Sequence, residues 1–269
     1  MKRILVILVL IASNINAQEH NTHNFVCPPC DNSCDTKIFA KAGKCNVCSM
    51  DLITKEKRDS DMIEPSKGKR TIAFYLQEGV EVLDFAGPME VFSYAGYDVF
   101  TVSKTKALIR SQGILKVTPD YSIADAPKSD ILAFFGGNAD NAYRDEKVID
   151  WVKAQTDVDY YFSVCTGAFV LAEAGILNGH TATTFHGALN DFENRYSKVN
   201  VKRNVRFVDN GTVITTAGVS AGIDGALHMV AKLEGLKKAK EVAFYMEYDK
   251  WKPGEGLILS MDNPYIVKQ

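Results

Sequence analysis

Residues 160–184 read YYFSVCTGAFVLAEAGILNGHTATT, and this stretch decides the fold. It opens with a short apolar run at 160–164, which is typical of a buried strand. A helical pattern at 167–174 follows, with only Cys165 and Thr166 in between. A strand that runs directly into a helix is typical of a parallel sheet with covering helices. The sequence therefore predicts a sharp strand-to-helix turn that holds Cys165 at the carboxyl end of the strand.

The same alternation of strand and helix patterns extends from residue 71 to about residue 250. Apolar or β-rich runs bounded by turns predict strands at 71–76, 97–103, 131–137, 160–164 and 212–216. Helical patterns fall at 81–94, 143–155, 167–174, 188–196, 221–233 and 237–248. This order predicts an α/β domain at 71–250 of the flavodoxin-like, doubly wound kind, with a mostly parallel sheet. Because ligands of such sheets bind beyond the carboxyl ends of the strands, the residues just after each strand are the candidates for a site.

Cys165 is the first of these candidates. A cysteine at the start of a helix feels the positive end of the helix dipole, which lowers the pKa of the thiol and supplies thiolate at neutral pH. The small residues Gly167 and Ala168 let the turn close tightly. The alternative is a buried structural cysteine, which is common in parallel sheets. The position at a strand end favours a nucleophile.

Backbone amides and one carboxyl group are candidate partners of this thiol. Gly136 and Gly137 end another predicted strand, where the lack of a side chain lets N–H groups approach a substrate oxygen. Together with the N–H of Thr166 they predict an oxyanion hole. Asp84 follows the first predicted strand and is a candidate general acid and base. The alternative is that Asp84 caps a helix that starts at the Gly-Pro pair of 87–88.

The other five cysteines lie near the N-terminus, in a module at 24–53 that has few apolar residues. They are Cys27, Cys30, Cys34, Cys45 and Cys48, in two Cys-x-x-Cys pairs with Cys34 between the pairs. Two such pairs place four thiolates around one ion in the tetrahedral arrangement that zinc prefers. Metal binding would also supply the folding energy that so short a segment lacks. The alternative is a module held by disulfides, because an exported protein matures in an oxidising compartment.

Residues 1–17 have the three parts of a secretory signal peptide. Lys2 and Arg3 precede an apolar run at 4–12, and a small, polar stretch ends before Gln18. The apolar run is too short to span a bilayer, which needs about 20 apolar residues. We therefore expect an exported, periplasmic or secreted protein with no membrane span in the mature chain.

The remaining segments and the composition limit the classes of function. The charged stretch at 54–70 is expected to be an exposed linker, and 251–269 a C-terminal tail. The chain has 31 Lys and Arg against 33 Asp and Glu, a formal charge of −2. Without a basic excess to bind a phosphate backbone, nucleic acid is not an expected partner.

Four motifs of the large domain resemble the ThiJ/PfpI superfamily, which is related to the class I glutamine amidotransferases. The motifs are GVEVLDFAGPMEVF at 79–92, FFGGN at 134–138, SVCTGAFVLAEAGILNGHTATT at 163–184 and VITTAGVSAGIDGALHMVAKLEG at 213–235. The Leu-Asp-x-x-Gly-Pro-x-Glu-Val-Phe segment at 83–92 and the Cys-Thr-Gly turn at 165–167 are most similar to the isocyanide hydratase branch. The resemblance implies that Cys165 is the nucleophile, that Asp84 is its acid and base partner, and that the amides near Gly137 and Thr166 bind a substrate oxygen. It also implies a small-molecule substrate and a homodimer.

The chain departs from the pattern of this family after the helix that follows Cys165. Related hydratases carry Thr-Thr-His-Trp where residues 183–186 read Thr-Thr-Phe-His, so the imidazole moves by one residue. A shift of one residue can turn a side chain to the other face of a strand. His186 therefore either reaches the thiolate as a base or caps the helix that follows. His180 and His228 are expected to be surface and helix residues.

The Cys-rich module resembles the short heavy-metal-binding domain of bacterial metal-efflux proteins. The match covers the FVCP start at 25–28 and the GKCNVCSMDL end at 43–52. That domain has Met-His after Cys-Pro, whereas this chain has Pro-Cys at 29–30, and thiolates in place of a histidine favour zinc or a softer ion. Met50 is either a Cu(I) ligand or an apolar plug. The resemblance implies a module that docks to a metal-handling partner or senses metal.

Two functions therefore compete. The first is an exported cysteine-dependent enzyme, with no cofactor for catalysis, that hydrates or hydrolyses a small electrophilic C–N or carbonyl compound. Its chemistry would be isocyanide hydratase-like or glyoxalase/deglycase-like. The second is a metal or oxidative-stress sensor in which Cys165 is a redox thiol. A transcription regulator is not expected, because only 19 residues follow the predicted domain.

Overall fold

The computed structural model describes residues 24–27, 33–34, 36–55, 57–58, 69–113 and 115–265. The predicted leader at 1–17, most of the predicted linker and Cys30 lie outside the described residues. The chain divides into two compact units, 1–66 and 67–269. Among the described residues, no helix combines the length and the apolar character that a bilayer crossing requires.

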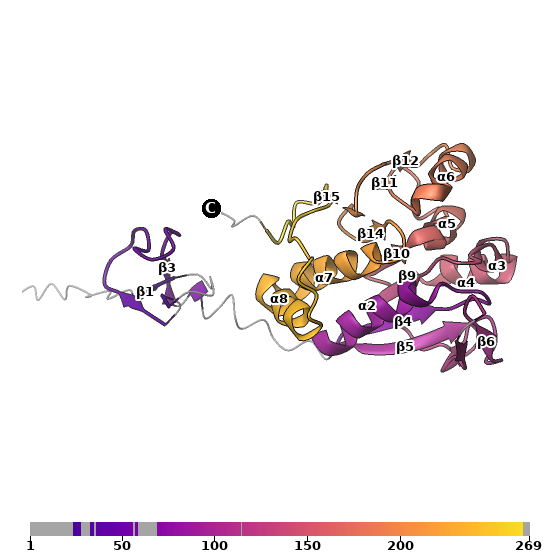
Figure 1. Ribbon diagram of the computed structural model, residues 1–269, viewed down its shortest axis with the longest axis horizontal. Helices are drawn as coiled ribbons and strands as arrows, with labels where there is room; N and C mark the ends of the chain where they lie inside the picture. The colour runs from indigo at the N-terminus through magenta and orange to yellow at the C-terminus, as the bar shows by residue number, and fades with distance from the viewer. Residues whose placement is uncertain are drawn as a thin grey trace, which may run out of the picture. The chain divides into compact units, whose positions relative to one another are not determined.

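An eight-stranded sheet forms the centre of the larger unit (Figure 1). In spatial order its strands are β15 (Leu257–Ile258), β13 (Phe207–Asp209), β14 (Val213–Thr216), β10 (Tyr160–Val164), β9 (Ile131–Phe134), β4 (Thr71–Tyr75), β5 (Asp98–Ser103) and β8 (Tyr121–Ser122). β13 and β14 pair antiparallel, and every other neighbouring pair of this sheet is parallel. The five predicted strands form β4, β5, β9, β10 and β14, so the prediction of a mostly parallel α/β fold is confirmed.

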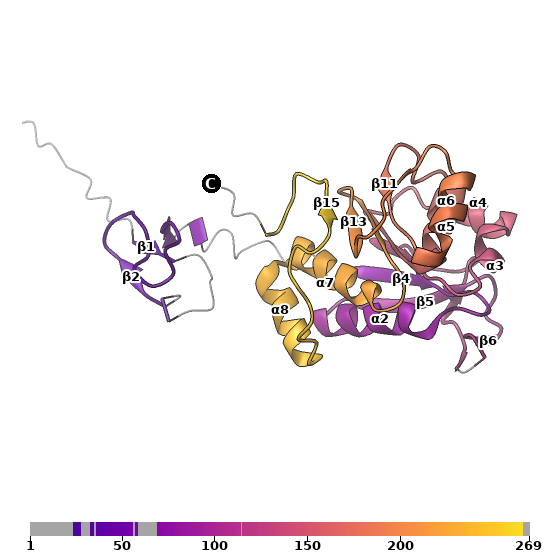
Figure 2. The same ribbon diagram turned by 45° about the horizontal axis from the view of Figure 1, so that its top comes forward.

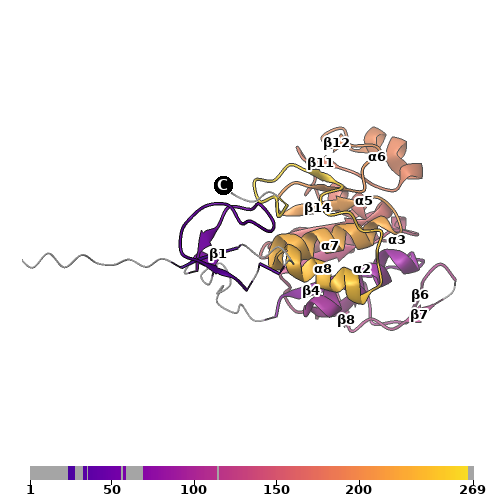
Figure 3. The ribbon, with the colours of Figure 1, turned by 60° about the vertical axis from the view of Figure 1, so that its left-hand side comes forward.

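Helices cover both faces of this sheet. On one face α2 (Val82–Ala95), α7 (Ala221–Glu234) and α8 (Leu236–Tyr245) lie side by side, in front of the sheet in Figure 3. On the other face lie α3 (Asp140–Tyr143), α4 (Glu146–Ala154), α5 (Ala168–Glu173) and α6 (Leu189–Arg195), as Figure 2 shows. Two short ladders complete the unit, β6 (Ile109–Arg110) with β7 (Lys116–Val117) and β11 (Thr181–Ala182) with β12 (Asn200–Val201).

Alternation of side chains along the central strands supplies the cores of both layers. On β4, Ile72 and Phe74 pack in the cluster that contains α2, α7 and α8. Ala73 and Tyr75 pack in the other cluster, with α4 and α5. Successive residues of a strand point to opposite faces, so a strand that is buried on both faces reads as an unbroken apolar run. This explains why TIAFYL shows no polar alternation.

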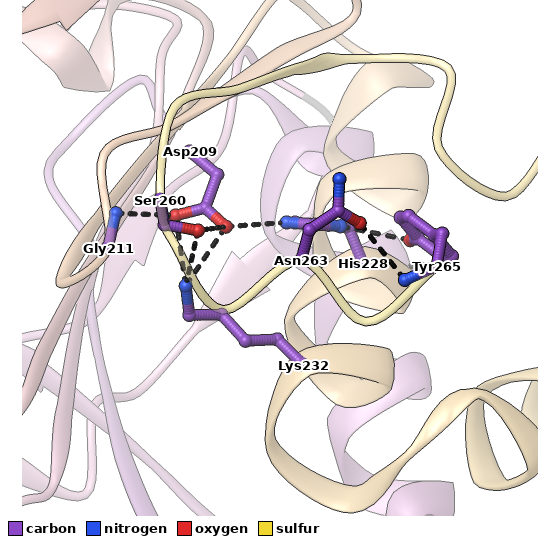
Figure 4. A network of polar contacts seen from close by, with 7 residues as sticks. All are labelled: Asp209, Gly211, His228, Lys232, Ser260, Asn263 and Tyr265. Atoms are coloured by element: carbon purple, nitrogen blue, oxygen red, sulfur yellow. Dashed lines mark hydrogen bonds and ion pairs between the residues drawn. The ribbon is translucent and has the colours of Figure 1, made fainter. Parts of the chain in front are cut away.

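The segment after residue 250 belongs to the sheet unit rather than to a separate tail. Trp251 is buried, and β15 joins the edge of the sheet by pairing with β13. Farther along, the hydroxyls of Ser260 and Tyr265 reach a buried polar network (Figure 4). The prediction of a tail at 251–269 is therefore corrected as far as residue 265.

The network in Figure 4 joins α7 to β13. The fully buried carboxylate of Asp209 accepts hydrogen bonds from His228 Nε2 at 2.9 Å and Lys232 Nζ at 3.0 Å. His228 Nδ1 lies 2.9 Å from the hydroxyl oxygen of Tyr265, and the hydroxyl of Ser260 donates to Asp209 at 3.1 Å. His228 is a helix residue, as expected, and it is fully buried with both ring nitrogens bonded to partners.

The N-terminal unit is a small antiparallel sheet beside a cluster of cysteines. Its strands, in spatial order, are β2 (Ile38–Phe39), β1 (Phe25–Val26) and β3 (Ile53–Thr54). An isolated bridge pairs Lys44 with Asp51. Phe39, Met50 and Leu52 pack against the cysteines. Because so few apolar side chains are available, the cysteine cluster is the centre of this unit.

Candidate functional site

Cys165 lies on a tight turn between β10 and the helix that follows. Val164 is extended, Cys165 has a left-handed φ of 59°, and η1 (Cys165–Gly167) then leads into α5. The N–H of Cys165 donates to the carbonyl of Ala217 at 3.1 Å, and the hydroxyl of Thr184 donates to the carbonyl of Cys165 at 2.6 Å. A positive φ is costly for a residue with a Cβ, and these two hydrogen bonds hold it in place. The structure thus contains the predicted elbow.

Gly136 brings the side chains of Cys165 and Asp84 together. A Cβ on Gly136 would lie 2.7 Å from Cys165 Sγ and 2.8 Å from Asp84 Oδ2, so a larger residue would displace one of them. The N–H of Gly136 donates to Asp84 Oδ2 at 2.8 Å, and the N–H of Val219 donates to Oδ1 at 2.9 Å. Thiol and carboxyl group therefore share one buried site.

Asp84 reaches this site from the first turn of α2. The helix begins at Val82 and contains Pro88, so no helix starts at 87–88. The carboxyl group is fully buried and accepts N–H groups from the ends of other strands rather than from its own helix. The alternative of a helix cap is therefore wrong.

Burial dominates the titration of both groups. It raises the pKa of Asp84 to about 6, although the two N–H groups on its oxygens favour the charged form. Burial, followed by the nearby charge of Asp84, raises the pKa of Cys165 to about 12. The prediction of a thiol pKa lowered by the helix is therefore wrong, because desolvation beside a carboxylate outweighs the helix dipole. At neutral pH the carboxyl group is ionised and the sulfur keeps its proton.

Two of the three predicted backbone donors reach the sulfur. The amides of Gly137 and Thr166 hydrogen-bond Cys165 and favour its charged form. Gly137 has a φ of 85°, and a Cβ there would lie 2.2 Å from the carbonyl oxygen of Gly79, so glycine is required for this approach. The amide of Gly136 is already bonded to Asp84. The Gly136 amide is therefore not available as an oxyanion donor, and the amides of Gly137 and Thr166 remain the predicted ones.

His186 lies outside the site shared by Cys165 and Asp84. It is exposed at the start of η2 (His186–Ala188), with its ring centroid 4.2 Å from that of Phe185. Its side chain lines a cavity of about 600 Å³ that also touches Arg206. In the part of the chain that the structure describes, no hydrogen bond joins His186 to Cys165. The structure therefore does not place its imidazole as a base for the thiol.

The loop at 217–219 completes the site; it lies in the family motif at 213–235, but the sequence predicted no role for it in the site. The carbonyl of Ala217 accepts the elbow N–H, and Val219 holds Asp84. A Cβ on Gly218 would lie 3.3 Å from Cys165 Sγ. Val219 has a φ of 54°, which is rare for a β-branched residue and marks a constrained position. The available signal was the position of the loop directly after the strand predicted at 212–216, because that strand ends at the same crevice.

The N-terminal unit brings four thiols together. The sulfur atoms of Cys27, Cys34, Cys45 and Cys48 all lie within 4.8 Å of one another. The Cys27 and Cys48 sulfurs are 3.0 Å apart, and the Cys34 and Cys27 sulfurs are 3.8 Å apart. A tetrahedral ion with Zn–S bonds of about 2.3 Å needs sulfurs about 3.8 Å apart. The four-thiol cluster can therefore hold a metal ion. Cys30, the fifth predicted ligand, lies outside the described residues.

Comparison with known proteins identifies the family of the larger unit. The model of the DJ-1/PfpI family matches residues 70–232. The chain belongs to the DJ-1/PfpI family. This DJ-1/PfpI chain is 34% identical to isonitrile hydratase from Pseudomonas putida over 180 residues, which cover 66% of this chain and 78% of the relative. The family resemblance seen in the sequence is therefore confirmed.

Solved structures of DJ-1/PfpI proteins show the same fold. A ThiJ/PfpI family protein from Pseudomonas syringae superposes with a TM-score of 0.64 at 28% identity, over 76% of this chain and 85% of that one. DJ-1beta from Drosophila melanogaster superposes with a TM-score of 0.61 at 21% identity, over 67% of this chain and 98% of that one.

A transcription regulator is also among the sequence relatives. CdhR of Pseudomonas aeruginosa is 27% identical, but this chain spans only 52% of its length.

Proposed function

We propose that this DJ-1/PfpI family member is an enzyme that hydrates a small electrophilic carbon compound through Cys165. One observation carries the proposal: the thiol meets the Asp84 carboxylate at Gly136, and two backbone amides hydrogen-bond the same sulfur. Isonitriles are the first candidate substrates, because a 34% identical relative is an isonitrile hydratase.

In the first half of the reaction the sulfur adds to the terminal carbon of R–N≡C. Asp84 takes the proton from the thiol as the S–C bond forms, because at neutral pH the carboxylate is free to accept it. The same proton passes from Asp84 to the isonitrile carbon, which gives a thioimidate, Cys–S–CH=N–R. No proton is gained or lost, and Asp84 returns to its ionised form.

In the second half water releases the product. Asp84 takes a proton from a water molecule that attacks the thioimidate carbon and passes it to the nitrogen, which gives the adduct Cys–S–CH(OH)–NH–R. The amides of Gly137 and Thr166 stabilise the negative charge that develops on the oxygen as Asp84 takes the hydroxyl proton. The C=O bond forms, the C–S bond breaks, and Asp84 returns this proton to the sulfur, which releases the formamide R–NH–CHO. The overall reaction is R–NC plus water to R–NH–CHO.

The geometry favours this enzyme over the redox sensor. A redox thiol needs thiolate character and access to oxidant, and both fall when the thiol is buried beside a carboxylate. Burial and the Asp84 charge raise the pKa of Cys165 to about 12. A thiol that is deprotonated only as it attacks a bound substrate suits turnover instead.

The N-terminal features belong to the same proposal. We propose that the leader at 1–17 exports the chain to the periplasm or out of the cell, and that the larger unit forms a homodimer.

The four-thiol cluster would hold zinc or another soft metal ion. The donor chemistry and the sulfur spacing support this assignment. Its role would be to stabilise the N-terminal unit, and a metal-handling protein is the partner that such a unit would suit.

Turnover tests the proposal directly. The purified protein is incubated with alkyl and aryl isonitriles, and formamide is measured by mass spectrometry for the wild type, Cys165→Ala and Asp84→Asn. We expect formamide from the wild type and none above background from Cys165→Ala. Asp98→Asn, at an exposed carboxylate on β5, is the matched control and should keep full turnover. Undiminished turnover in Cys165→Ala would refute the proposal.

A further inference from the structure

Phe185 lies beside the Cys165 thiol. A Cβ on Gly218 would lie 3.3 Å from Cys165 Sγ and 2.6 Å from Phe185 Cδ2, so sulfur and ring flank the same glycine. A Cβ on Gly187 would lie 2.9 Å from Phe185 Cε1, which places that glycine against the ring as well. The ring is half-buried and packs against the apolar cluster of α2 and α7. It is thus a fixed apolar surface next to the proposed nucleophile.

The side chains that adjoin Asp84 are apolar, while the exposed His186 lies against Phe185, with ring centroids 4.2 Å apart. Leu83 and Val219 are 40% and 37% exposed, and both adjoin Asp84, the first in sequence and the second through its N–H group. Among the described residues, no lysine, arginine or histidine forms a hydrogen bond or ion pair with the Asp84 carboxylate. The Asp84 carboxylate therefore adjoins apolar side chains and has no hydrogen-bonded basic partner among the described residues.

This combination discriminates between substrates by charge. An anionic substituent would be repelled by Asp84, and the repulsion is strong where water is excluded. A cationic substituent would pair with Asp84 and make the carboxylate a weaker base for the thiol proton. A neutral, apolar substituent interferes with neither step and gains by covering the Phe185 ring.

We propose that Phe185 determines the specificity of this site, and that the substrates are neutral compounds with an apolar substituent next to the reacting carbon. The inference rests on the proposed function in one respect, since it takes Cys165 as the nucleophile. Within that function it favours alkyl and aryl isonitriles over hydrated glyoxals and charged glycated amines.

Thiol labelling tests the inference without requiring turnover. The full chain is treated with N-benzylmaleimide, which is neutral and apolar, or with iodoacetate, which is anionic, and labelling of the Cys165 peptide is followed by mass spectrometry. Each rate is divided by the rate for glutathione to remove intrinsic reactivity. We expect the wild type to favour N-benzylmaleimide over iodoacetate by at least 10-fold, a usual magnitude for discrimination by an apolar pocket.

Three variants separate specificity from folding. Phe185→Ala should lose at least 10-fold of the preference, and Phe185→Leu should keep most of it. Phe185→His should be labelled by iodoacetate faster than the wild type below about pH 6.5, where an imidazole is charged. Phe244→Ala, which removes an 87% exposed ring on α8, should match the wild type. Melting temperatures identify a variant that fails to fold, and Phe185→Leu then supplies the comparison. An unchanged preference in folded Phe185→Ala would overturn the inference.

Turnover distinguishes this inference from the proposed function. With an aryl isonitrile, Phe185→Ala should raise KM more than it lowers kcat, whereas an isonitrile that carries a carboxylate should be a poor substrate of the wild type. If no isonitrile is hydrated but the labelling preference depends on Phe185, the hydratase proposal fails and the specificity inference stands. If formamide forms equally well from both isonitriles, the specificity inference fails and the hydratase proposal stands.

Discussion

At the scale of single residues, the chemistry of the site depends on where one proton resides. Burial raises the pKa of both Asp84 and Cys165, but the thiol starts from the higher value and is further disfavoured by the carboxylate. The result is an ionised acid beside a protonated thiol at neutral pH. Such a pair needs no permanent thiolate, because the base is already in contact with the group it must deprotonate.

The pH dependence of turnover follows from this pair. With the pKa of Asp84 raised to about 6, the base is protonated and lost as the pH falls through that value, so kcat/KM should decline below about pH 6. Asp84→Asn should reduce kcat/KM by about 10²–10⁴-fold and abolish this acid limb. Rates measured from pH 5 to 9 check both effects. A wild-type profile that is flat down to pH 5 would contradict the role of Asp84.

The residues of this site could be predicted where a motif fixes the backbone conformation. They could not be predicted where a neighbouring element determines the surroundings of the side chain. Cys165 and Gly137 were predicted because they stand at the carboxyl ends of predicted strands. The direction of the thiol pKa was predicted wrongly, because the burial of the sulfur and the charge of Asp84 come from segments distant in sequence. The position of Phe185 beside Cys165 depends on a single residue of register, which periodicity does not fix.

At the scale of elements, the central strands and the covering helices could be predicted because their apolar patterns are long and regular. The C-terminal segment was missed. β15 has two residues, and what holds the segment is a buried polar network rather than an apolar run. Polar contacts between Asp209 and residues about 50 positions away leave no periodic signal in the sequence.

Because of that network, replacement of Asp209 should lower the stability of this edge of the sheet most. Asp209→Asn leaves the 3% exposed Lys232 without its carboxylate, so we expect the free energy of unfolding to fall by about 3–5 kcal/mol. Asp191→Asn breaks an exposed i,i+4 pair with Arg195 and should cost less than about 0.5 kcal/mol. Denaturant unfolding at pH 7 compares the two variants. Similar losses would show that the buried network is not what secures the segment.

The same carboxylate predicts how stability changes with pH. Burial opposes the charged form of Asp209, but the hydrogen bonds from His228 and Gly211 and the charge of Lys232 outweigh it and lower the pKa of Asp209. A lowered pKa in the folded state contributes stability above the unfolded value of about 3.9, and this contribution is lost as the pH falls below that value. Asp209→Asn should therefore flatten the dependence of the unfolding free energy on pH below about pH 4.

At the scale of the whole molecule, two units with different sources of stability share one chain. The larger unit has two extensive apolar clusters, one on each face of its sheet. The N-terminal unit has three buried cysteines and few apolar neighbours. A unit this small needs a staple to remain folded, and a metal ion bound to four thiolates provides one.

Metal removal should therefore unfold one unit and spare the other. A strong chelator is expected to release about one metal ion per chain and to make the thiols of Cys27, Cys34, Cys45 and Cys48 reactive toward a thiol reagent. The melting temperature of the larger unit and the rate of formamide formation should stay unchanged. Cys34→Ser should lose the metal, because it removes one of the four clustered sulfurs. Lys41→Ser, at an exposed position of the same unit, is the control and should keep the metal, and Cys30→Ser is measured beside it. Metal retained by Cys34→Ser but lost from Cys30→Ser would show that the ligand set is the two Cys-x-x-Cys pairs instead. Turnover that is lost together with the metal would show that the ion also serves the reaction at Cys165.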